Sequence, residues 1–519
     1  MSDRTHQGPT PAWVIDVRAD APLEPRYLKI LSDVLRQGGT PFALRDLSQA
    51  LCRTPRCITT WLARRVLRLE SRLAPKDVFK AAPAVQTFPL RSDRPSDVMI
   101  IIQGDVSASR VRPVGADTVI VVTLSAGAST HTVGLQEVRD RAATVRFMVS
   151  IWTVGATLPM DVEVGVGTQF PFSWTRDLVL RKAMAFAGQC AVRLLQSGRL
   201  PLNSMQRGAQ SKPFGLPGIG TSRTAPWAVV DYSVRMALRL GRKFFLRATR
   251  QMPQWHIKLS HSNWREHIEG NSVAIPNPPG HFWADPFVVV HEGRTVVFVE
   301  DFVYARGLAH LSALEVDAHG GITNLGACLT EDFHLSFPFL FRWQGQLYMM
   351  PETHEAQQIR VYRCAEFPLK WELAAVLKEG VSAADSILIE RDGRWWLLTN
   401  IDSTGGGDHC SELHVFWADD PLSGSWTPHP ANPVVCDAAR ARNGGFLTEG
   451  SKLFRVSQMQ SYGIYGAGYA INEIEELSET GYRERTVYTQ RLGRGVTGAH
   501  HVSSDGGWSA SDELRWQRA

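Results

Sequence analysis

HFWADPFVVVHEGRTVVFVED, residues 281–301, is the first of five stretches of 21 residues that align without gaps in the second half of the chain. The other four are FHLSFPFLFRWQGQLYMMPET (333–353), VSAADSILIERDGRWWLLTNI (381–401), AARARNGGFLTEGSKLFRVSQ (438–458) and RGVTGAHHVSSDGGWSASDEL (494–514). Each carries a glycine at the same offset, and in at least the first four a strand-like run lies on both sides of it. These glycines are Gly293, Gly345, Gly393, Gly450 and Gly506. A glycine between two strand-like runs predicts a hairpin turn that needs positive φ.

The spacing of the five stretches predicts a β-propeller. Successive stretches begin 52, 48, 57 and 56 residues apart. Two further segments, IRVYRCAEFPLKW (359–371) and LHVFWADDPLSGSW (413–426), resemble each other, and each predicts a third strand that leads to an outer strand. Four strands in about 50 residues is typical of a propeller blade. We therefore expect an all-β domain of five blades over residues 255–519, with the fifth copy fitting the pattern least well.

The first half of the chain predicts an α/β domain over residues 1–200. Two apolar, β-branched runs, 98–102 and 118–124, are typical of strands buried on both faces of a parallel sheet. Residues 25–37 and 177–196 show helical patterns beside them. We expect a Rossmann-like arrangement of these elements. No GxGxxG or P-loop sequence follows a strand, so the sequence predicts no cofactor.

Residues 201–254 separate the two domains. Within them, 201–227 is rich in proline, glycine and serine, which is typical of a linker. Residues 231–250 carry Arg235, Arg239, Arg242, Lys243, Arg247 and Arg250 against one acidic residue, Asp231. A basic amphipathic helix can contact an anionic membrane surface, whereas a helix that bridges two domains packs between them. Gly241 interrupts the helical pattern and favours the bridging helix.

The composition excludes several classes of protein. Of 519 residues, 44% are hydrophobic and 21% are charged, which is typical of a globular chain and not of a disordered one. The net charge of +5 is too small for this length to indicate a nucleic-acid partner. Sixteen tryptophans are present, and 11 of them follow residue 254. We attribute most of that surplus to large aromatics that fill the wedges between blades.

The cysteines and the N-terminus indicate a compartment. The seven cysteines are an odd number without a CxxC pair, and Cys52 and Cys57 have no histidine nearby, so no metal site is predicted. The N-terminal MSDRTHQGPTPAW lacks the apolar stretch of a signal peptide. No run of about 18 apolar residues indicates a membrane span. We expect a reduced, cytoplasmic protein that contacts the inner membrane face peripherally if segment 231–250 binds lipid.

Polar residues recur where the first strand of each blade would line the central channel. The aligned column before each turn reads Asp285, Phe337, Asp385, Arg442 and Gly498. The column 15 residues further on reads Glu300, Glu352, Asn400 and Ser457, with no clear counterpart in the fifth copy. Near these columns lie His334, Ser336, Asn443, Gln458, His500 and His501. Carboxylates, an arginine and aromatic rims in one concave pocket are typical of a sugar site.

From these columns we expect Asp285, Asp385 and Glu352 to be catalytic. We expect the following residues to bind substrate: Arg442, His334, Asn443, Gln458, His501 and Glu300. Each has a structural alternative. The two aspartates could set turns, Arg442 could pair with either of them or with Glu352, and the histidines could be satisfied core residues. Because Glu300 and Asp301 are adjacent on a strand, at most one of them points into the channel.

The starts of the repeats resemble the five-bladed propellers of glycoside hydrolase family 43 and, more closely, the propeller domain of the glucosamine inositolphosphorylceramide transferase group. The similar stretches are ADPF (284–287), HLSFP (334–338), PET (351–353), DSIL (385–388), DGRWWL (392–397), NPV (432–434), RNGG (442–445), and Gln458 with Tyr465 and Gly466. This resemblance covers about 250 residues. It implies a five-bladed propeller in a carbohydrate-active protein whose substrate is a sugar or a nucleotide sugar.

The first half resembles the degenerate formyltransferase-like domain that bacterial members of this group carry. The resemblance rests on the two buried runs and on GLQEV (134–138) after them. The active-site pattern of true formyltransferases, with its asparagine and histidine, has no match. The resemblance therefore implies no formyl transfer.

Two departures from the related families bear on the reaction. The hydrolases use an aspartate base in the first blade, a pKa-tuning aspartate in the third and a glutamate acid in the fourth, and here these places hold Asp285, Asp385 and Arg442. Arginine cannot protonate a departing alkoxide, but it can bind a departing phosphate. In the plant proteins of the group, transfer is attributed to a separate domain after the propeller. We expect no such domain here, because the chain ends at Ala519.

Three functions stay open on this evidence. The favoured one is an enzyme of bacterial surface-glycan or glycolipid assembly that transfers a sugar from an activated phosphate donor, with Asp285 as base and Arg442 on the phosphate. The second is an inverting glycoside hydrolase of the family 43 type, with Glu352 as its acid. The third is a propeller that binds glycans without catalysis.

Overall fold

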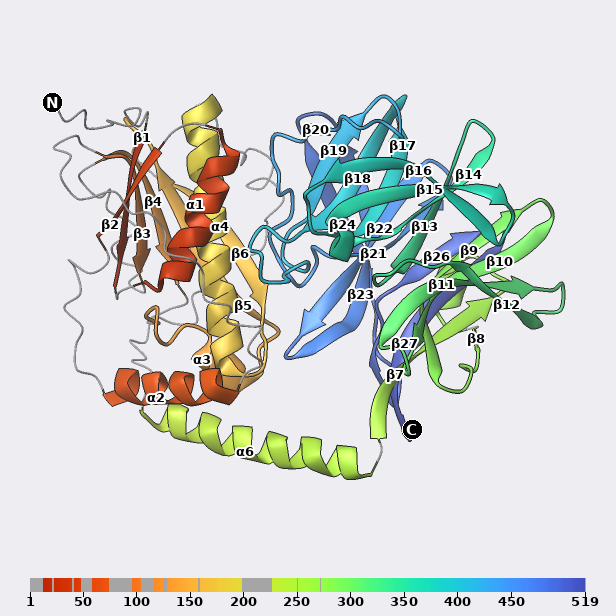
Figure 1. Cartoon of the computed structure of the whole chain (residues 1–519), viewed down its shortest axis with the longest axis horizontal. Coiled ribbons are helices and arrows are strands. Elements are labelled where there is room, and N and C mark those ends of the chain that lie inside the picture. Colours follow the sequence, from red (N-terminus) through yellow and green to blue (C-terminus); the bar gives the residue numbers. More distant parts are fainter. Residues whose placement is uncertain are drawn as a thin grey trace, which may run out of the picture. The chain divides into compact units, whose positions relative to one another are not determined.

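The computed structural model describes residues 13–20, 23–39, 42–47, 58–73, 96–103, 116–124, 128–156, 159–197, 226–249, 251–270 and 272–518. The chain divides into two compact units: the first runs to Ala237 and includes Ser403–Gly406, and the second comprises Leu238–Asp402 and Gly407–Ala519. Figure 1 traces the elements of both units along the sequence. Cys52, Cys57 and the predicted linker up to residue 225 lie outside the described residues.

The first unit is an α/β domain built on a six-stranded mixed sheet of order β2-β1-β3-β4-β5-β6. Its strands are β1 (Trp13–Ala19), β2 (Phe42–Asp46), β3 (Ser96–Gln103), β4 (Ala116–Thr123), β5 (Thr144–Trp152) and β6 (Met160–Gly167). The pairs β1–β2, β1–β3 and β3–β4 are parallel, whereas β4–β5 and β5–β6 are antiparallel. The runs predicted at 98–102 and 118–124 form β3 and β4, and apolar residues such as Ile100 and Val121 are fully buried there.

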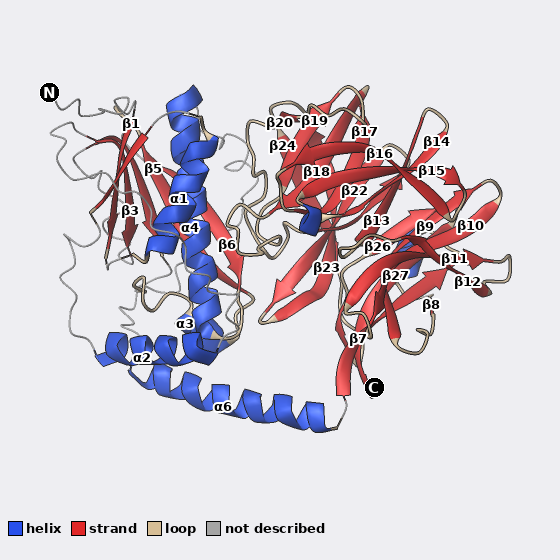
Figure 2. Cartoon of the chain, viewed as in Figure 1, coloured by secondary structure: helices blue, strands red, loops and turns tan. Residues whose placement is uncertain are grey.

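Four helices accompany this sheet, and Figure 2 distinguishes them from the strands by colour. They are α1 (Pro25–Gln37), α2 (Ile58–Leu73), α3 (Leu135–Asp140) and α4 (Phe172–Ser197). The helix predicted at 25–37 is α1, and the one predicted at 177–196 lies within α4. Helix α4 approaches α1 closely at Gly188, where an added Cβ would lie 3.0 Å from Val34 and 3.1 Å from Leu31.

Helix α6 (Pro226–Ala248) follows, and it continues through Gly241 without a break. Its N-terminal part is held by Tyr232, whose hydroxyl accepts the Phe172 N–H at 2.9 Å and hydrogen bonds with the carboxylate of Glu70. None of the helices in the described ranges is both long enough and apolar enough to cross a membrane.

The second unit is a five-bladed β-propeller, as the sequence predicts. The first blade holds β9 (His281–His291), β10 (Arg294–Val303), β11 (Leu308–Val316) and β12 (Ile322–Leu329), and the second holds β13 (Ser336–Trp343), β14 (Gln346–Glu352), β15 (Gln358–Glu366) and β16 (Lys370–Glu379). The third holds β17 (Ala383–Arg391), β18 (Arg394–Ile401), β19 (His414–Ala418) and β20 (Thr427–Pro428), and the fourth holds β21 (Asn443–Glu449), β22 (Lys452–Ser461), β23 (Ile464–Leu477) and β24 (Tyr482–Thr489).

The fifth blade combines the two ends of the propeller. Strands β25 (Val496–Gly498), β26 (Val502–Asp505) and β27 (Trp508–Arg518) come from the end of the chain. Strands β7 (Gln251–Ser260) and β8 (Val273–Ala274) come from before the first blade; β7 pairs with β27, and β8 pairs with β7. The inner strands then contact one another in turn, from β9 through β13, β17 and β21 to β26 and back to β9. Pairing of β7 with β27 therefore closes the ring through backbone hydrogen bonds.

The repeated glycines form the expected hairpin turns. Their φ angles are positive in all five blades: 73° at Gly293, 75° at Gly345, 74° at Gly393, 58° at Gly450 and 57° at Gly506. The wedges between blades are filled by apolar side chains. Trp283, Trp395, Trp396, Trp426 and Trp508 are all buried, so these tryptophans pack the blades.

A bulge interrupts the inner strand of each of the first four blades at the same place in the repeat. The register shifts between the first and second strands there, after Ala284, Ser336, Ala384 and Asn443. In blades one to three the bulged residue has a left-handed backbone, with φ of 48° at Asp285, 47° at Phe337 and 44° at Asp385. Bulges redirect side chains, and such strained residues gather at functional sites.

Candidate active site

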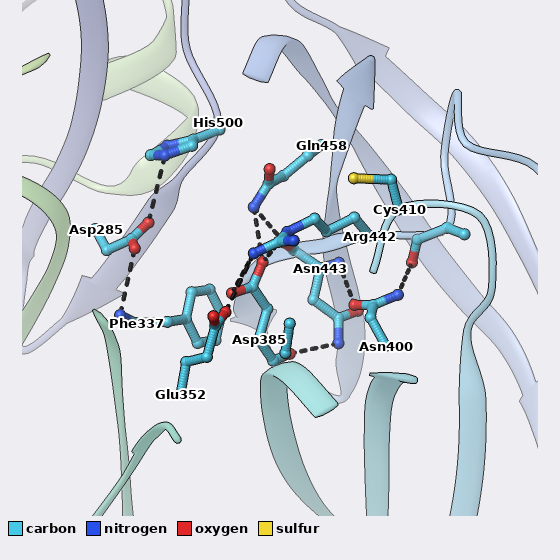
Figure 3. A network of polar contacts seen from close by, with 12 residues as sticks. Asp285, Phe337, Glu352, Asp385, Asn400, Cys410, Arg442, Asn443, Gln458 and His500 are labelled. Carbon is cyan, nitrogen blue, oxygen red and sulfur yellow. Dashed lines mark hydrogen bonds and ion pairs between the residues drawn. The ribbon is translucent and has the colours of Figure 1, made fainter. Parts of the chain in front are cut away.

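Charged side chains from four blades lie at the propeller centre: Asp285 and Asp385 from the bulges of inner strands, Glu352 from the end of β14, and Arg442 from just before β21. Figure 3 shows Asp285, Glu352, Asp385 and Arg442 in one network of polar contacts. Asp285 acts electrostatically on Asp385, because the negative charge of Asp285 helps to raise the pKa of Asp385. Residues more than 150 positions apart in sequence therefore share one site.

Arg442 is the centre of this network. Its Nε donates to Asp385 Oδ2 at 2.6 Å, and its Nη2 donates to Asp385 Oδ1 at 3.2 Å and to Glu352 Oε2 at 3.1 Å. All three side chains are buried. A two-pronged contact of this kind fixes both the distance and the orientation of a carboxylate. Arg442 therefore holds the two acids of neighbouring blades in place.

The pKa values of the two carboxylates on Arg442 shift in opposite directions. Burial raises the pKa of Asp385, the charge of Arg442 opposes the shift, and the neighbouring Glu352 adds to it. Burial also acts to raise the pKa of Glu352, but a contact with His354 Nδ1 at 2.7 Å and the Arg442 charge outweigh it and lower that pKa. Glu352 is therefore ionised at neutral pH.

A second group of charges surrounds Asp285. His500 Nδ1 lies 2.6 Å from Asp512 Oδ2, and His500 Nε2 lies 3.7 Å from Asp285 Oδ1. Asp285 Oδ2 accepts the Phe337 N–H at 3.3 Å, and Asp512 Oδ1 accepts the backbone N–H groups of His500 and His501. Backbone N–H groups of the second and fifth blades and one histidine thus orient these two aspartates.

The pKa values in this second group fall in the range useful for proton transfer. Burial raises the pKa of Asp285 to about 7, against the opposing charge of His500. Burial acts to lower the pKa of His500, but the charges of Asp512 and Asp285 outweigh it and raise that pKa to about 9. At neutral pH, Asp285 can therefore both accept and release a proton beside a cationic His500.

Gln458 and Tyr465 complete the surroundings of Arg442. Gln458 Nε2 donates to Asp385 Oδ2 at 2.9 Å and to the Asn443 carbonyl at 2.8 Å. Its buried Oε1 has no hydrogen-bond partner among the described residues, so it can accept a hydroxyl of a ligand. The Arg442 guanidinium lies 5.0 Å from the centre of the Tyr465 ring, and the Tyr465 residue is 43% exposed. Tyr465 therefore offers an aromatic face beside the charged cluster.

His334 and Glu300 lie together in the first two blades. His334 Nε2 is 3.3 Å from Glu300 Oε1. Burial acts to lower the pKa of His334, but this contact and the Glu300 charge raise it. The adjacent Asp301 instead contacts His281 at 2.7 Å and accepts a hydrogen bond from Ser312. Of the two adjacent acids, Glu300 is thus the one whose charge acts on Asp285.

Two of the predicted substrate-binding residues have structural partners. The Asn443 carboxamide donates to the carbonyls of Asp385 at 2.7 Å and Leu398 at 3.1 Å, which ties the third blade to the fourth. His501 is fully buried, and its ring packs at 4.3 Å on Phe287 and at 5.6 Å on Phe337. Burial lowers the pKa of His501 to about 3. His501 is therefore a neutral core residue.

Sequence reasoning placed His500 near the channel and named Tyr465 in the family resemblance without assigning a role to either, and it missed Asp512 and His354. His354 follows Glu352 by two residues, a spacing that could have suggested the pair. Asp512 lies on β27, in the copy whose register is least regular. No sequence signal pairs it with His500, because the pairing depends on how the fifth blade folds.

Asp285, His500 and Asp512 form the one group in the described ranges whose ligand atoms could surround a metal ion, all lying within 4.8 Å of one another. A metal-bound histidine must be neutral. The raised pKa of His500 and its contact with Asp512 favour the protonated ring instead. The donor chemistry of this group thus fits an ion-paired triad better than a metal centre.

Comparison with known proteins places the propeller beside a transferase family. Residues 261–495 match the model of the family described as glucosamine inositolphosphorylceramide transferase 1, N-terminal. The glucosamine inositolphosphorylceramide transferase 1 of Oryza sativa subsp. japonica is 34% identical over 271 residues, which are 46% of this chain and 36% of that protein. The protein of the same name from Arabidopsis thaliana is 37% identical over 212 residues, which are 40% and 27% of the two chains.

These matches confirm the resemblance that the repeat starts indicate. The chain spans about a third of the length of the curated relatives it matches. Among solved structures, an α-L-arabinofuranosidase from Podospora anserina aligns with a TM-score of 0.35 and 10% identity over 47% of this chain and 93% of its own. The family 117 glycoside hydrolase from Zobellia galactanivorans aligns with a TM-score of 0.31 and 10% identity over 50% and 91%.

Proposed function

We propose that the propeller carries the active site of a glycosyltransferase that moves a sugar from an activated phosphate donor to an acceptor in bacterial surface-glycan or glycolipid assembly. The observation that carries the proposal is Asp285, a buried carboxyl with a pKa of about 7 beside a cationic His500. The relatives that match this propeller are named as transferases, which supports transfer over hydrolysis.

In the proposed reaction, Asp285 takes the proton of the acceptor hydroxyl as that oxygen attacks the anomeric carbon of the donor. The bond between the sugar and the phosphate breaks, and the phosphate leaves with the bonding electron pair. A phosphate needs no proton to leave, so a fourth-blade acid is not required. His500, held by Asp512 at 2.6 Å, keeps a positive charge beside Asp285 and stabilises its ionised form.

Arg442 takes a narrower role in this proposal than the sequence alone suggests. Its Nε and Nη2 are used by Asp385 and Glu352, so it positions these carboxylates. A donor phosphate could bind Arg442 by replacing the 3.1 Å contact with Glu352, which leaves the two contacts to Asp385 intact. Gln458 Oε1 and the exposed face of Tyr465 would then contact the sugar.

The hydrolase alternative loses support from the state of Glu352. A general acid needs a pKa near the working pH, as a raised carboxyl pKa provides. The contacts with His354 and Arg442 lower the pKa of Glu352 instead. Glu352 therefore cannot supply the proton that a departing sugar alkoxide requires.

Two finer features belong to the proposal. A cytoplasmic site is supported by Cys328, Cys364 and Cys410, which are free thiols, as is usual in a reducing compartment. The N-terminal unit is proposed to be a Rossmann-like, degenerate relative of formyltransferases. The run of parallel pairing from β2 through β1 and β3 to β4 supports that origin.

The test is turnover by the full chain with a panel of nucleotide sugars and lipid-phosphate sugars, followed by mass spectrometry of the products. We expect activity to rise with pH through about 7, as Asp285 ionises, and to fall through about 9, as His500 loses its proton. Asp285→Asn should reduce kcat at least about 100-fold, the typical contribution of a general base.

Asp392→Asn is the matched control, because Asp392 lies at the exposed turn of the third blade and has the same left-handed backbone, with φ of 56°. It should keep wild-type activity. A profile that only falls through pH 7 would reassign Asp285 as an acid and would contradict the proposed base. Sugar binding by calorimetry without turnover of any donor would establish the glycan-binding alternative.

A further inference from the structure

Helix α6 carries a row of large apolar side chains that face solvent. Trp227 and Phe244 are each 78% exposed, Leu238 is 69% exposed and Phe245 is 64% exposed. Val230, Val234 and Leu240 on the same helix are also exposed. Soluble proteins rarely leave so many large apolar residues uncovered on one element. The helix is drawn as one continuous element in Figure 1.

Most of these side chains share one face. Positions 227, 230, 234, 238, 241 and 245 are separated by three or four residues, which is the spacing of one face of an α-helix. We call this row, with Gly241 in its middle, the apolar stripe. No added Cβ at Gly241 would meet another atom of the described residues within 4 Å, so the stripe is open there too.

The side of α6 that packs on the first unit is a different one. Val229 and Tyr232 are buried, and the Tyr232 ring packs edge-on against Phe172 at 6.0 Å. Tyr232 is two residues from both Val230 and Val234, which places it about 200° around the helix from them. The apolar stripe therefore points away from the surface that anchors the helix.

The charge of the helix indicates what covers the stripe. Helix α6 contains five basic residues, Arg235, Arg239, Arg242, Lys243 and Arg247, and one acidic residue, Asp231, so its net charge is +4. None of these charges occupies a position of the stripe. Aromatic and aliphatic residues on one side and arginines on the other is the pattern of a helix that lies in the interface of an anionic bilayer.

We propose that α6 binds anionic membranes, with the apolar stripe inserted between lipid headgroups and the basic residues on headgroup phosphates. From position 227 to 245 the stripe extends over about 27 Å, enough to lie flat along a membrane surface. Its charged residues prevent the helix from crossing the bilayer, in agreement with the absence of a membrane-spanning helix from the described ranges. The proposal does not depend on the reaction proposed for the propeller.

The experiment is vesicle flotation of the full chain. Vesicles of phosphatidylcholine alone are compared with vesicles in which about one lipid in three is phosphatidylglycerol. We expect the protein to float only with the anionic vesicles and to be released by added salt, because salt screens the arginines. The double variant Leu238→Glu/Phe245→Glu should bind at least about tenfold less, since both changes place a negative charge in the apolar stripe that would enter the membrane.

The matched control is Leu369→Glu/Leu373→Glu, which places the same charges on two exposed leucines of the propeller. It should float as the wild type does. Arg242→Gln/Lys243→Gln should weaken binding to anionic vesicles while leaving the stripe intact. Thermal unfolding of each variant shows whether it has folded.

Three results would overturn the proposal. One is wild-type protein that stays at the bottom with both kinds of vesicle. Another is a stripe variant that floats as well as the control. The third is a wild-type dimer, seen by analytical ultracentrifugation, that the stripe variant converts to monomer while neither binds vesicles, since a second copy would then cover the stripe.

Discussion

Asp285 and Asp385 occupy the same place in two blades and acquire different chemistry there. Both sit at the bulge of an inner strand, with φ of 48° and 44°, and both are buried. Asp385 is held by the Arg442 guanidinium at 2.6 and 3.2 Å. Asp285 has the backbone N–H of Phe337 at 3.3 Å and the more distant His500 at 3.7 Å.

The difference originates in the neighbouring blades. In the blade after Asp385, Arg442 extends its guanidinium to that carboxylate, whereas in the blade after Asp285, Phe337 offers only its backbone N–H. The charge near Asp285 comes from His500 of the fifth blade instead. The repeated backbone thus fixes where each acid lies, and the next blade decides whether that acid is tightly paired or free to exchange a proton.

Replacing Arg442 should produce the largest effect. Arg442→Met leaves Asp385 and Glu352 buried without their shared cation, which should lower the free energy of unfolding by about 3–5 kcal/mol. Urea unfolding followed by tryptophan fluorescence measures it. Arg442→Lys is the control, because it keeps the charge but loses the two-pronged contact, and its loss should be smaller. A loss below about 1 kcal/mol for Arg442→Met would contradict the ion-paired arrangement.

The charges around Asp285 should make the free energy of unfolding depend on pH. The folded pKa of His500, about 9, lies above the ordinary histidine value of about 6.5, so the stabilisation from its charge is complete below about pH 6.5 and is lost as pH rises through 9. The size of that loss should be on the order of 3 kcal/mol. The raised pKa of Asp285 affects stability only up to about pH 7, so the step above pH 7 belongs to His500.

Melting temperatures of the wild type and of His500→Gln from pH 6 to 10 measure this step. The variant should be less stable at pH 6 and should show a flatter profile above pH 7, because it has no imidazolium to lose. An equally steep decline in the variant would mean that another group titrates there.

The smallest expected effects come from the same substitution, Asp→Asn, at both aspartates, and they compare the two sites directly. Asp385→Asn leaves one acceptor oxygen for two guanidinium donors, so it should cost roughly 2–3 kcal/mol. Asp285→Asn keeps an oxygen for the Phe337 N–H, and Asp285 is mostly uncharged at pH 6 because its pKa is about 7, so the substitution should cost about 1 kcal/mol or less. Chemical unfolding at pH 6 measures both, and equal losses would show that the two sites do not differ.

Local patterns in the sequence predicted the architecture because each blade repeats the same short-range physics. The glycine turns at Gly293, Gly345 and Gly393 and the alternating runs beside them require only neighbouring residues to form hairpins. The apolar runs that became β3 and β4 are likewise local signals of buried strands. The α/β character of the first unit was predictable for that reason.

Long-range pairing was not predictable in the same way. Strand β7 pairs with β27 across more than 240 residues, and the stretch 251–260 carries no repeat signal that assigns it to a blade. The contact between His500 and Asp512 depends on that completed blade. The continuous path of α6 through Gly241 was also decided by context, since a helix that carries one glycine loses only about 1 kcal/mol.

The sequence by itself determined the number of blades, the turns and the set of polar residues that line the inner strands, because these follow from periodicity and from side-chain type. Only the tertiary structure decided which of those residues touch. It bound Arg442 to Asp385 and Glu352, it enclosed His501 between phenylalanines, and it left Asp285 beside His500. Pairing of buried charges depends on distances of a few ångströms between blades, and those distances exist only once the ring has closed.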